Sequence, residues 1–114
     1  MSRQMAGLQA WILQRITAVY LAVFSLVALP YLLFSPPADY LEWQRTVGNP
    51  WVYTTLLLFV LAVLIHAWVG LRDIAIDYVK PFVLRLAVLI LIGAALVVTG
   101  IWVVSILLAQ VITV

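Results

Sequence analysis

Three long windows without a charged side chain limit what this chain can fold into. They run from Ile16 to Phe34, from about Trp51 to Leu71, and from Leu86 to Val114. At ~1.5 Å of rise per helical residue, each window is long enough to cross a hydrocarbon core of ~30 Å. The pattern therefore predicts three transmembrane helices.

The composition agrees with this prediction. Of the 114 residues, 68% are hydrophobic, compared with roughly 45–50% in soluble globular proteins. We therefore predict an all-α membrane protein that forms one membrane-anchor domain over residues 1–114, with spans at about 16–35, 51–71 and 86–112.

The stretches between the windows contain residues that end helices. Ser35-Pro36-Pro37 follows the first window, and proline lacks the backbone donor that a helix needs. Residues 38–50 are polar, with turn residues toward their end, and we interpret them as a connector that is too short to form a domain. Pro81 predicts that the second helix ends at or just before Lys80.

The few basic residues are distributed unevenly between the two ends of the predicted bundle. With three spans, the N-terminus and the second connector lie on the same side, which carries Arg3, Arg15, Arg72, Lys80 and Arg85. The opposite side carries only Arg45. Because basic residues accumulate in cytoplasmic loops, we predict a cytoplasmic N-terminus and a periplasmic C-terminus.

Composition also excludes several classes of function. The chain contains no cysteine, which rules out disulfides, thiolate-bound zinc, protein-bound iron–sulfur clusters and covalently attached c-type haem in this chain. The net charge of +2 is too small and too dispersed for a nucleic-acid-binding surface. Any redox centre held by this chain must therefore be bound non-covalently.

His66, the only histidine, lies inside the second window. An ionisable side chain within a span costs on the order of a few kcal/mol, so it usually faces a cofactor, a polar partner or a water-filled cavity. Ala62 and Gly70, four residues to either side, are small and would let a large planar ligand approach the imidazole. Imidazole is a good axial ligand for haem iron, but it also makes structural hydrogen bonds between membrane helices. The residues alone leave both interpretations open.

The haem interpretation requires help from a second polypeptide. A six-coordinate haem needs two axial ligands, and the chain has no other histidine. Met1 and Met5 both lie outside the predicted spans. The second ligand would therefore have to come from a partner.

The polar residues after His66 suggest a second site. If the helix continues past Leu71, His66, Gly70, Asp73 and Asp77 share one face. Tyr78 could donate a hydrogen bond to a quinone carbonyl, and Asp77 could tune that phenol or relay a proton. The alternative is an interfacial tyrosine beside an aspartate that pairs with Lys80 or Arg85.

Other charged and small residues have simpler interpretations. Arg15 could bind a haem propionate, but its long side chain could equally reach lipid phosphate. Arg72 and Asp73 are interpreted as boundary charges. Gly93 and Gly100, with Ala94 and Ala95, offer small surfaces where a neighbouring helix could approach closely.

The segment from His66 to Leu86, HAWVGLRDIAIDYVKPFVLRL, resembles the hydrophobic membrane anchor of bacterial succinate dehydrogenase, the D subunit of complex II. The spacing from the histidine to the Asp-Tyr pair looks the same as in enterobacterial members. The similarity covers the whole three-span layout, with Arg15 in a position like that of the arginine before the family's first span. The chain departs from the enterobacterial pattern at Leu71-Arg72-Asp73, where it adds charge next to the cytoplasmic boundary.

This resemblance implies specific roles for the site residues. His66 would be one axial ligand of haem b, and a C-type cytochrome b anchor subunit would supply the other. Tyr78 would hydrogen-bond a ubiquinone carbonyl, and Asp77 would support that site. Flavoprotein and iron–sulfur subunits would carry out succinate oxidation, and this chain would hold them at the bacterial inner membrane.

Three rival interpretations remain at this stage. A fumarate reductase anchor has the same architecture and runs in the opposite direction with a lower-potential quinone. A non-redox structural or assembly protein would use His66 only to bridge helices. A transporter or channel subunit would need polar residues through more than one span, and the first and third windows contain few.

Overall fold

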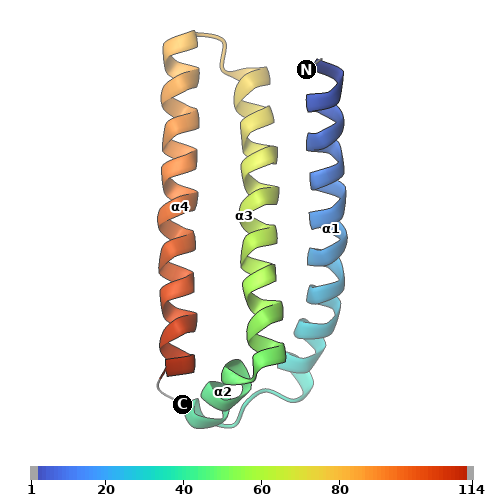
Figure 1. Ribbon diagram of the computed structural model, residues 1–114, viewed down its shortest axis with the longest axis vertical. Helices are drawn as coiled ribbons and strands as arrows, with labels where there is room; N and C mark the ends of the chain where they lie inside the picture. Colours follow the sequence, from blue (N-terminus) through green and yellow to red (C-terminus); the bar gives the residue numbers. More distant parts are fainter. Residues whose placement is uncertain (1–2, 113–114) are drawn as a thin grey trace.

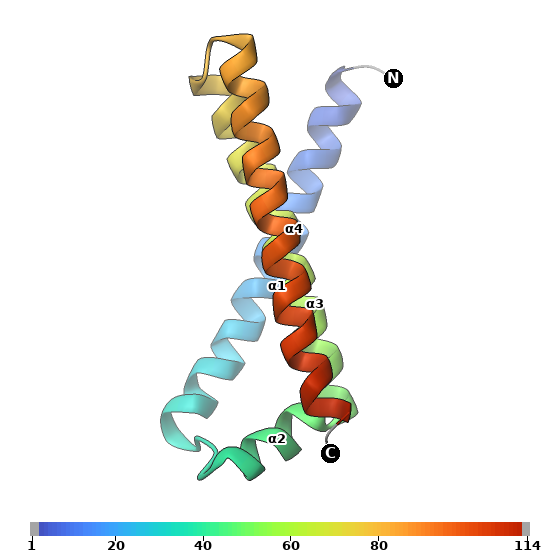
Figure 2. The same ribbon diagram turned by 90° about the vertical axis from the view of Figure 1, so that its left-hand side faces the viewer.

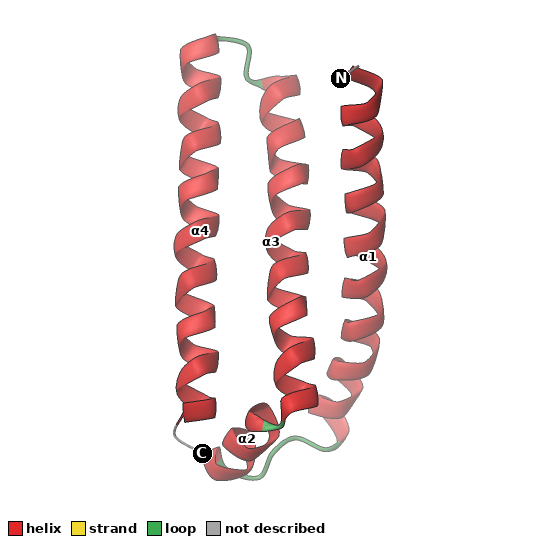
Figure 3. Cartoon of the chain, viewed as in Figure 1, coloured by secondary structure: helices red, strands yellow, loops and turns green. Residues whose placement is uncertain are grey.

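The chain forms a helical bundle, seen here in a computed structural model that describes residues 3–112, with side chains from Met5 onward. Over this range helices account for nearly all residues and the loops are short (Figure 3). The elements in order are α1 (Arg3–Phe34), α2 (Tyr40–Gly48), α3 (Pro50–Tyr78) and α4 (Phe82–Ile112). The side chain of Arg3, which entered the topology prediction, lies outside the described residues.

The three predicted spans are confirmed, but the helices are longer than the charge-free windows. Candidate membrane spans cover Met5–Phe34, Pro50–Tyr78 and Phe82–Ile112. Charged residues such as Arg15 and Arg72 continue a helix as readily as apolar ones, since Arg has good helix propensity. The windows therefore mark the apolar part of each helix and not its ends. The bundle is 51 Å long, so its ends extend beyond a hydrocarbon core of ~30 Å.

The helix ends follow the predicted breakers. In α1, Pro30 lies inside the last turns and the helix ends at Phe34, directly before the Ser-Pro-Pro sequence. At the second connector, α3 ends at Tyr78 and its cap, Val79, donates its backbone N–H to the Ala75 carbonyl. Proline next to Lys80 prevents further extension, as predicted.

Residues 38–50 connect two spans, as predicted, but they also form helix α2, which the sequence interpretation missed. The Asp39 side chain accepts a hydrogen bond from Glu42 N at 2.8 Å, and Glu42 Oε2 accepts one from Ala38 N at 2.7 Å. Asp39 therefore caps the helix by satisfying a free backbone donor, and Glu42 reaches back to the N–H of the residue before the cap, an arrangement close to a capping box. The pattern Asp39-x-x-Glu42 was the signal in the sequence that could have revealed it.

Helix α2 closes one end of the bundle. It lies across the ends of the long helices (Figure 1) and contacts α3 and α4. Val47 on α2 is only 1% exposed, and the Tyr40 hydroxyl donates to Gln110 Oε1 on α4 at 3.1 Å. The connector is thus anchored to the bundle.

The long helices form a single layer with α3 in the middle (Figure 1). Helix α3 contacts both α1 and α4, whereas α1 and α4 do not contact each other over the described residues. Figure 2 shows α1 crossing the α3–α4 pair, with its N-terminal end splayed away from them. Both broad faces of this layer are open.

The predicted small-residue surface of the third span is used against α3. A Cβ built at Gly93 would lie 3.6 Å from the Trp68 ring, and one at Gly100 would lie 2.8 Å from Leu64 Cδ1. Gly100 is itself buried. Gly100 therefore lets α3 and α4 approach closely, as the sequence predicted, whereas Gly93 makes an ordinary van der Waals contact, and Ala94 and Ala95 are exposed.

The bundle buries little of its own apolar surface. The buried hydrophobic residues are Val47, Ala62, Val69, Ala75 and Leu107. Large apolar side chains such as Leu26, Leu33 and Ile112 are more than two-thirds exposed. In lipid these side chains carry no penalty, and helices satisfy their own backbone groups there.

Candidate functional site

His66 faces α1 from the middle of α3. Its Nδ1 lies 3.0 Å from the Oγ1 atom of Thr17 on α1, and the two atoms share a hydrogen bond. Thr17 is 6% exposed. Among the residues whose side chains are described, it is the only buried polar one. The structural role considered for His66, a hydrogen bond between helices, is therefore present, and its partner is the Thr17 hydroxyl.

The second ring nitrogen of His66 is available. Within the described part of the chain, Nε2 has no hydrogen-bond partner. It is nevertheless accessible, because the buried side-chain polar atom without a partner in that part of the chain is Gln14 Oε1. The ring is half-buried. An imidazole held at one nitrogen and open at the other has the form of a ligand.

The expected stripe forms because α3 continues past Leu71. Gly70 lies directly against α1, since a Cβ there would be 3.4 Å from Gln14 Nε2. Ala62 is also buried, at 7% exposed. The expectation that both small residues leave the imidazole face open to a planar ligand is therefore wrong at Gly70, where α1 covers that face. Any large ligand must approach His66 from the side where Nε2 is exposed.

A polar cleft lies beyond Gly70, where α1 splays from α3. It has a volume of about 580 Å³, and its lining includes Ala10, Trp11, Gln14, Arg72 and Asp73. Gln14 Oε1 is buried without a partner.

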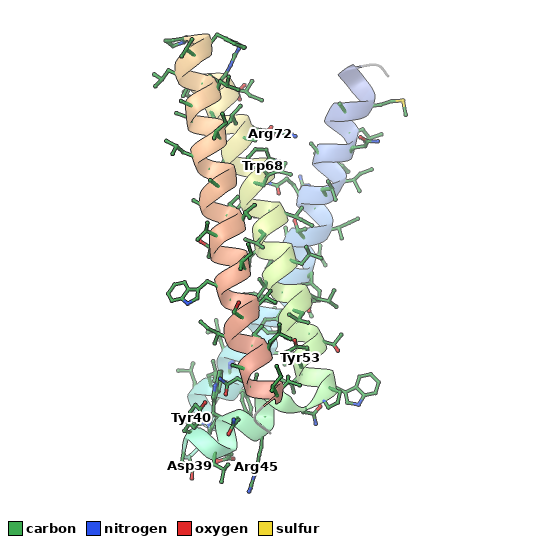
Figure 4. All side chains as sticks on the ribbon, turned by 60° about the vertical axis from the view of Figure 1, so that its left-hand side comes forward. Asp39, Tyr40, Arg45, Tyr53, Trp68 and Arg72 are labelled. Carbon is green, nitrogen blue, oxygen red and sulfur yellow. The ribbon has the colours of Figure 1, made fainter. Side chains whose placement is uncertain are left out.

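Arg72 and Asp73 pair with each other at 3.0 Å, in agreement with their interpretation as boundary charges. Figure 4 places Arg72 near the end of the bundle that holds the N-terminus, and Arg45 at the opposite end.

Arg15 does not lie beside His66. It is two residues from Thr17, which corresponds to about 200° around the α1 axis, so it points away from α3. Its side chain is exposed, and its guanidinium lies 5.3 Å from the centre of the Trp11 ring. The structure therefore does not bring Arg15 and His66 together.

Asp77 and Tyr78 lie in the last turn of α3, both exposed. Tyr78 is 80% exposed. At ~1.5 Å per residue, Tyr78 is roughly 18 Å from His66 along the helix. These two residues thus form a separate location at the end of the bundle. No ion pair links Asp77 to Lys80 or Arg85 among the described side chains.

Thr17 and Gln14 are the residues that sequence reasoning missed. Both are polar and lie on α1 opposite the His66 stripe. Thr17 was visible as one of few polar side chains in the first window, but nothing local linked it to a residue 49 positions away.

Comparison with known proteins places this architecture in a family. A family model described as succinate dehydrogenase/fumarate reductase transmembrane subunit matches residues 1–107. The succinate dehydrogenase hydrophobic membrane anchor subunit of Coxiella burnetii is 31% identical over 101 residues, which cover 89% of this chain and 88% of that protein. The chain belongs to the succinate dehydrogenase/fumarate reductase transmembrane subunit family. The anchor subunit of Rickettsia felis is 29% identical over 94 residues, covering 82% of this chain and 78% of that protein.

Membership in this family confirms the resemblance inferred from residues 66–86. With three apolar helices, the chain is a multi-pass protein of the bacterial inner membrane. It is a succinate dehydrogenase membrane anchor subunit, non-catalytic by itself. The family therefore favours the anchor interpretation over a transporter component or an unrelated assembly protein.

Proposed function

We propose that this anchor subunit binds one side of a b-type haem through His66 Nε2 and contributes Tyr78 and Asp77 to a ubiquinone site. The observation that carries the haem assignment is the state of the His66 ring: Nδ1 is held by Thr17, while Nε2 is unpartnered and accessible. Neutral imidazole with one nitrogen held and the other free is the usual form of a haem or metal ligand.

The donor set fits haem better than a bare metal ion. No group of three His, Asp or Glu side chains that could hold a metal occurs among the described residues. A metal at His66 would therefore take its other ligands from a macrocycle and from another chain. When bound, haem b would supply a one-electron redox centre within the membrane.

A partner subunit completes the haem site in this proposal. His66 is the only histidine of the chain, so the second axial ligand comes from a C-type cytochrome b anchor subunit. The open faces of the helix layer leave room for such helices. A flavoprotein and an iron–sulfur subunit oxidise succinate and deliver its electrons to this anchor.

The quinone assignment depends on the end of α3. The Tyr78 phenol is exposed, so it can donate a hydrogen bond to a quinone carbonyl within a pocket completed by partners. Asp77, on the same turn, can orient that phenol or pass a proton to it. We assign Arg15 to lipid phosphate, because it points away from the His66 face.

The haem assignment is tested by a reduced-minus-oxidised visible spectrum of the complex, purified through a tag on this chain. We expect a b-type α-band in the wild type and its loss or displacement in His66→Ala. Thr99→Ala, on the exposed surface of α4, is the matched control and should keep the band. An unchanged band in His66→Ala would overturn the assignment.

The quinone assignment is tested separately by Tyr78→Phe. We expect normal assembly and haem content with a lower rate of succinate-dependent quinone reduction. Tyr31→Phe makes the same chemical change near the other end of the bundle and should leave the rate unchanged. Equal rates in both variants would contradict a role for Tyr78.

We also propose that the end bearing Arg72 and Lys80 faces the cytoplasm. Basic residues gather at that end, and α2 with Arg45 lies at the other (Figure 4). Because the chain has no cysteine, Arg45→Cys and Lys80→Cys each introduce a single thiol. A membrane-impermeant maleimide added to spheroplasts should label Arg45→Cys and not Lys80→Cys, and the reverse pattern would overturn the orientation.

A further inference from the structure

The Thr17 hydroxyl has three neighbours and only one proton. Its Oγ1 lies 2.7 Å from the Leu13 carbonyl oxygen, 3.2 Å from the Gln14 carbonyl oxygen and 3.0 Å from His66 Nδ1. The direction of the bond to His66 depends on where that proton is.

The contact with the Leu13 carbonyl determines where the Thr17 hydroxyl proton lies. A carbonyl oxygen cannot donate, and 2.7 Å between two oxygens is the usual length of an O–H···O hydrogen bond. The hydroxyl therefore donates back to the Leu13 carbonyl, the four-residue bond that threonine commonly makes within helices. Toward His66, Oγ1 can offer only a lone pair, so Nδ1 must be the donor.

We propose that Thr17 is a positioning residue for His66, which it holds as the tautomer with the proton on Nδ1 and the lone pair on Nε2. As a result, Nε2, the ring nitrogen that does not contact α1, is the one able to bind iron. The orientation of the His66 ring is set before the cofactor enters. The tautomer follows from the hydrogen bonds of this chain, while its purpose rests on the haem ligation proposed above. A held Nδ1–H also increases the basicity of Nε2.

The first test measures the tautomer without any cofactor. Because His66 is the only histidine, the full chain labelled with ¹⁵N-histidine gives one pair of ring nitrogen signals. In haem-free chain in lipid nanodiscs at about pH 9, where free imidazole is neutral, we expect the proton on Nδ1. Thr17→Ser keeps the hydroxyl and should keep this signal, whereas Thr17→Val, of similar shape, should shift the population toward the other tautomer. A proton on Nε2 in the wild type, or no change in Thr17→Val, would overturn the proposal.

The control is Tyr20→Phe. This change removes the hydrogen bond from the Tyr20 hydroxyl to the Thr55 carbonyl in the same α1–α3 interface without touching His66. It should leave the tautomer unchanged, which separates positioning from general weakening of the interface. An equal shift in Tyr20→Phe and Thr17→Val would reduce Thr17 to a structural residue and overturn the proposal.

The second test uses the assembled complex. Loss of the Nδ1–H bond lowers the donor strength of the ligand, so the haem midpoint potential should shift to a more positive value in Thr17→Val and stay near the wild type in Thr17→Ser. Wild-type potential in a fully assembled Thr17→Val complex would overturn the proposal. A wild-type complex without haem would instead overturn the proposed function, and the labelling experiment would still decide the tautomer.

Discussion

Helix α3 meets α1 through polar and aromatic side chains and meets α4 through glycines. At the α1–α3 interface, Thr17 bonds His66, and the Tyr20 hydroxyl donates to the Thr55 carbonyl at 2.7 Å. Further along, the rings of Phe24 and Phe59 stack with their centres 4.4 Å apart.

At the α3–α4 interface, Gly93 receives Trp68 and Gly100 receives Leu64. In lipid, helices gain no hydrophobic free energy by association, so interfaces depend on close packing or on hydrogen bonds. Packing against glycine requires only matching shape. A hydrogen bond also fixes which atom points where, and at the α1–α3 interface it fixes the ring of His66.

The largest effect is expected from Gly100→Leu, which breaks the α3–α4 interface. Even a Cβ at this position would come within 2.8 Å of Leu64 Cδ1, and a leucine would force the helices apart. Overpacking of this kind costs about 1–3 kcal/mol. We expect a loss of this size in the free energy of unfolding of the full chain, measured by SDS titration in mixed micelles.

Gly7→Leu is the matched control, since a Cβ at Gly7 meets no other atom within 4 Å. It should leave the unfolding free energy close to wild type. Equal losses in the two variants would show that the α3–α4 interface does not depend on the space at Gly100.

A smaller effect is expected from Tyr20→Phe at the α1–α3 interface. Hydrogen bonds between membrane helices contribute about 0.6 kcal/mol on average. The ring at position 20, which stacks on Phe24 with the ring centres 6.2 Å apart, remains in the variant. The same SDS titration should give a loss of this order. A loss as large as that of Gly100→Leu would contradict the division of roles between the two interfaces.

The smallest effect is expected from Gly93→Ala. The added Cβ would lie 3.6 Å from the Trp68 ring, an ordinary van der Waals contact, and alanine is the better helix former. We expect a change within ~0.5 kcal/mol. A loss above ~1 kcal/mol would mean that the interface tolerates no side chain at either glycine.

Predictions from the sequence succeeded where they depended on local chemistry. Pro81 ended α3 before Lys80, and Gly100 formed a close contact with α3. The prediction failed for α2, because polarity was taken as a sign of a connector although Asp39 and Glu42 had the spacing of a capping box.

The candidate site could be predicted only in part. His66 was identified because an ionisable group in a span is costly and therefore has a purpose. Thr17 could not be identified as its partner, because a threonine inside a helix usually bonds its own backbone and signals nothing more. Arg15 is close to Thr17 in sequence, yet it lies on the far side of α1, which the sequence pattern did not reveal.

By itself, the sequence determined that this chain crosses the membrane three times and holds a single imidazole within the second span, because apolar length and the cost of an ionisable group are properties of each segment. Only the tertiary structure decided that α3 lies between α1 and α4, and which nitrogen of His66 is free. Both depend on which helix faces meet. That choice depends on packing and hydrogen bonds between residues far apart in the chain, such as Thr17 and His66.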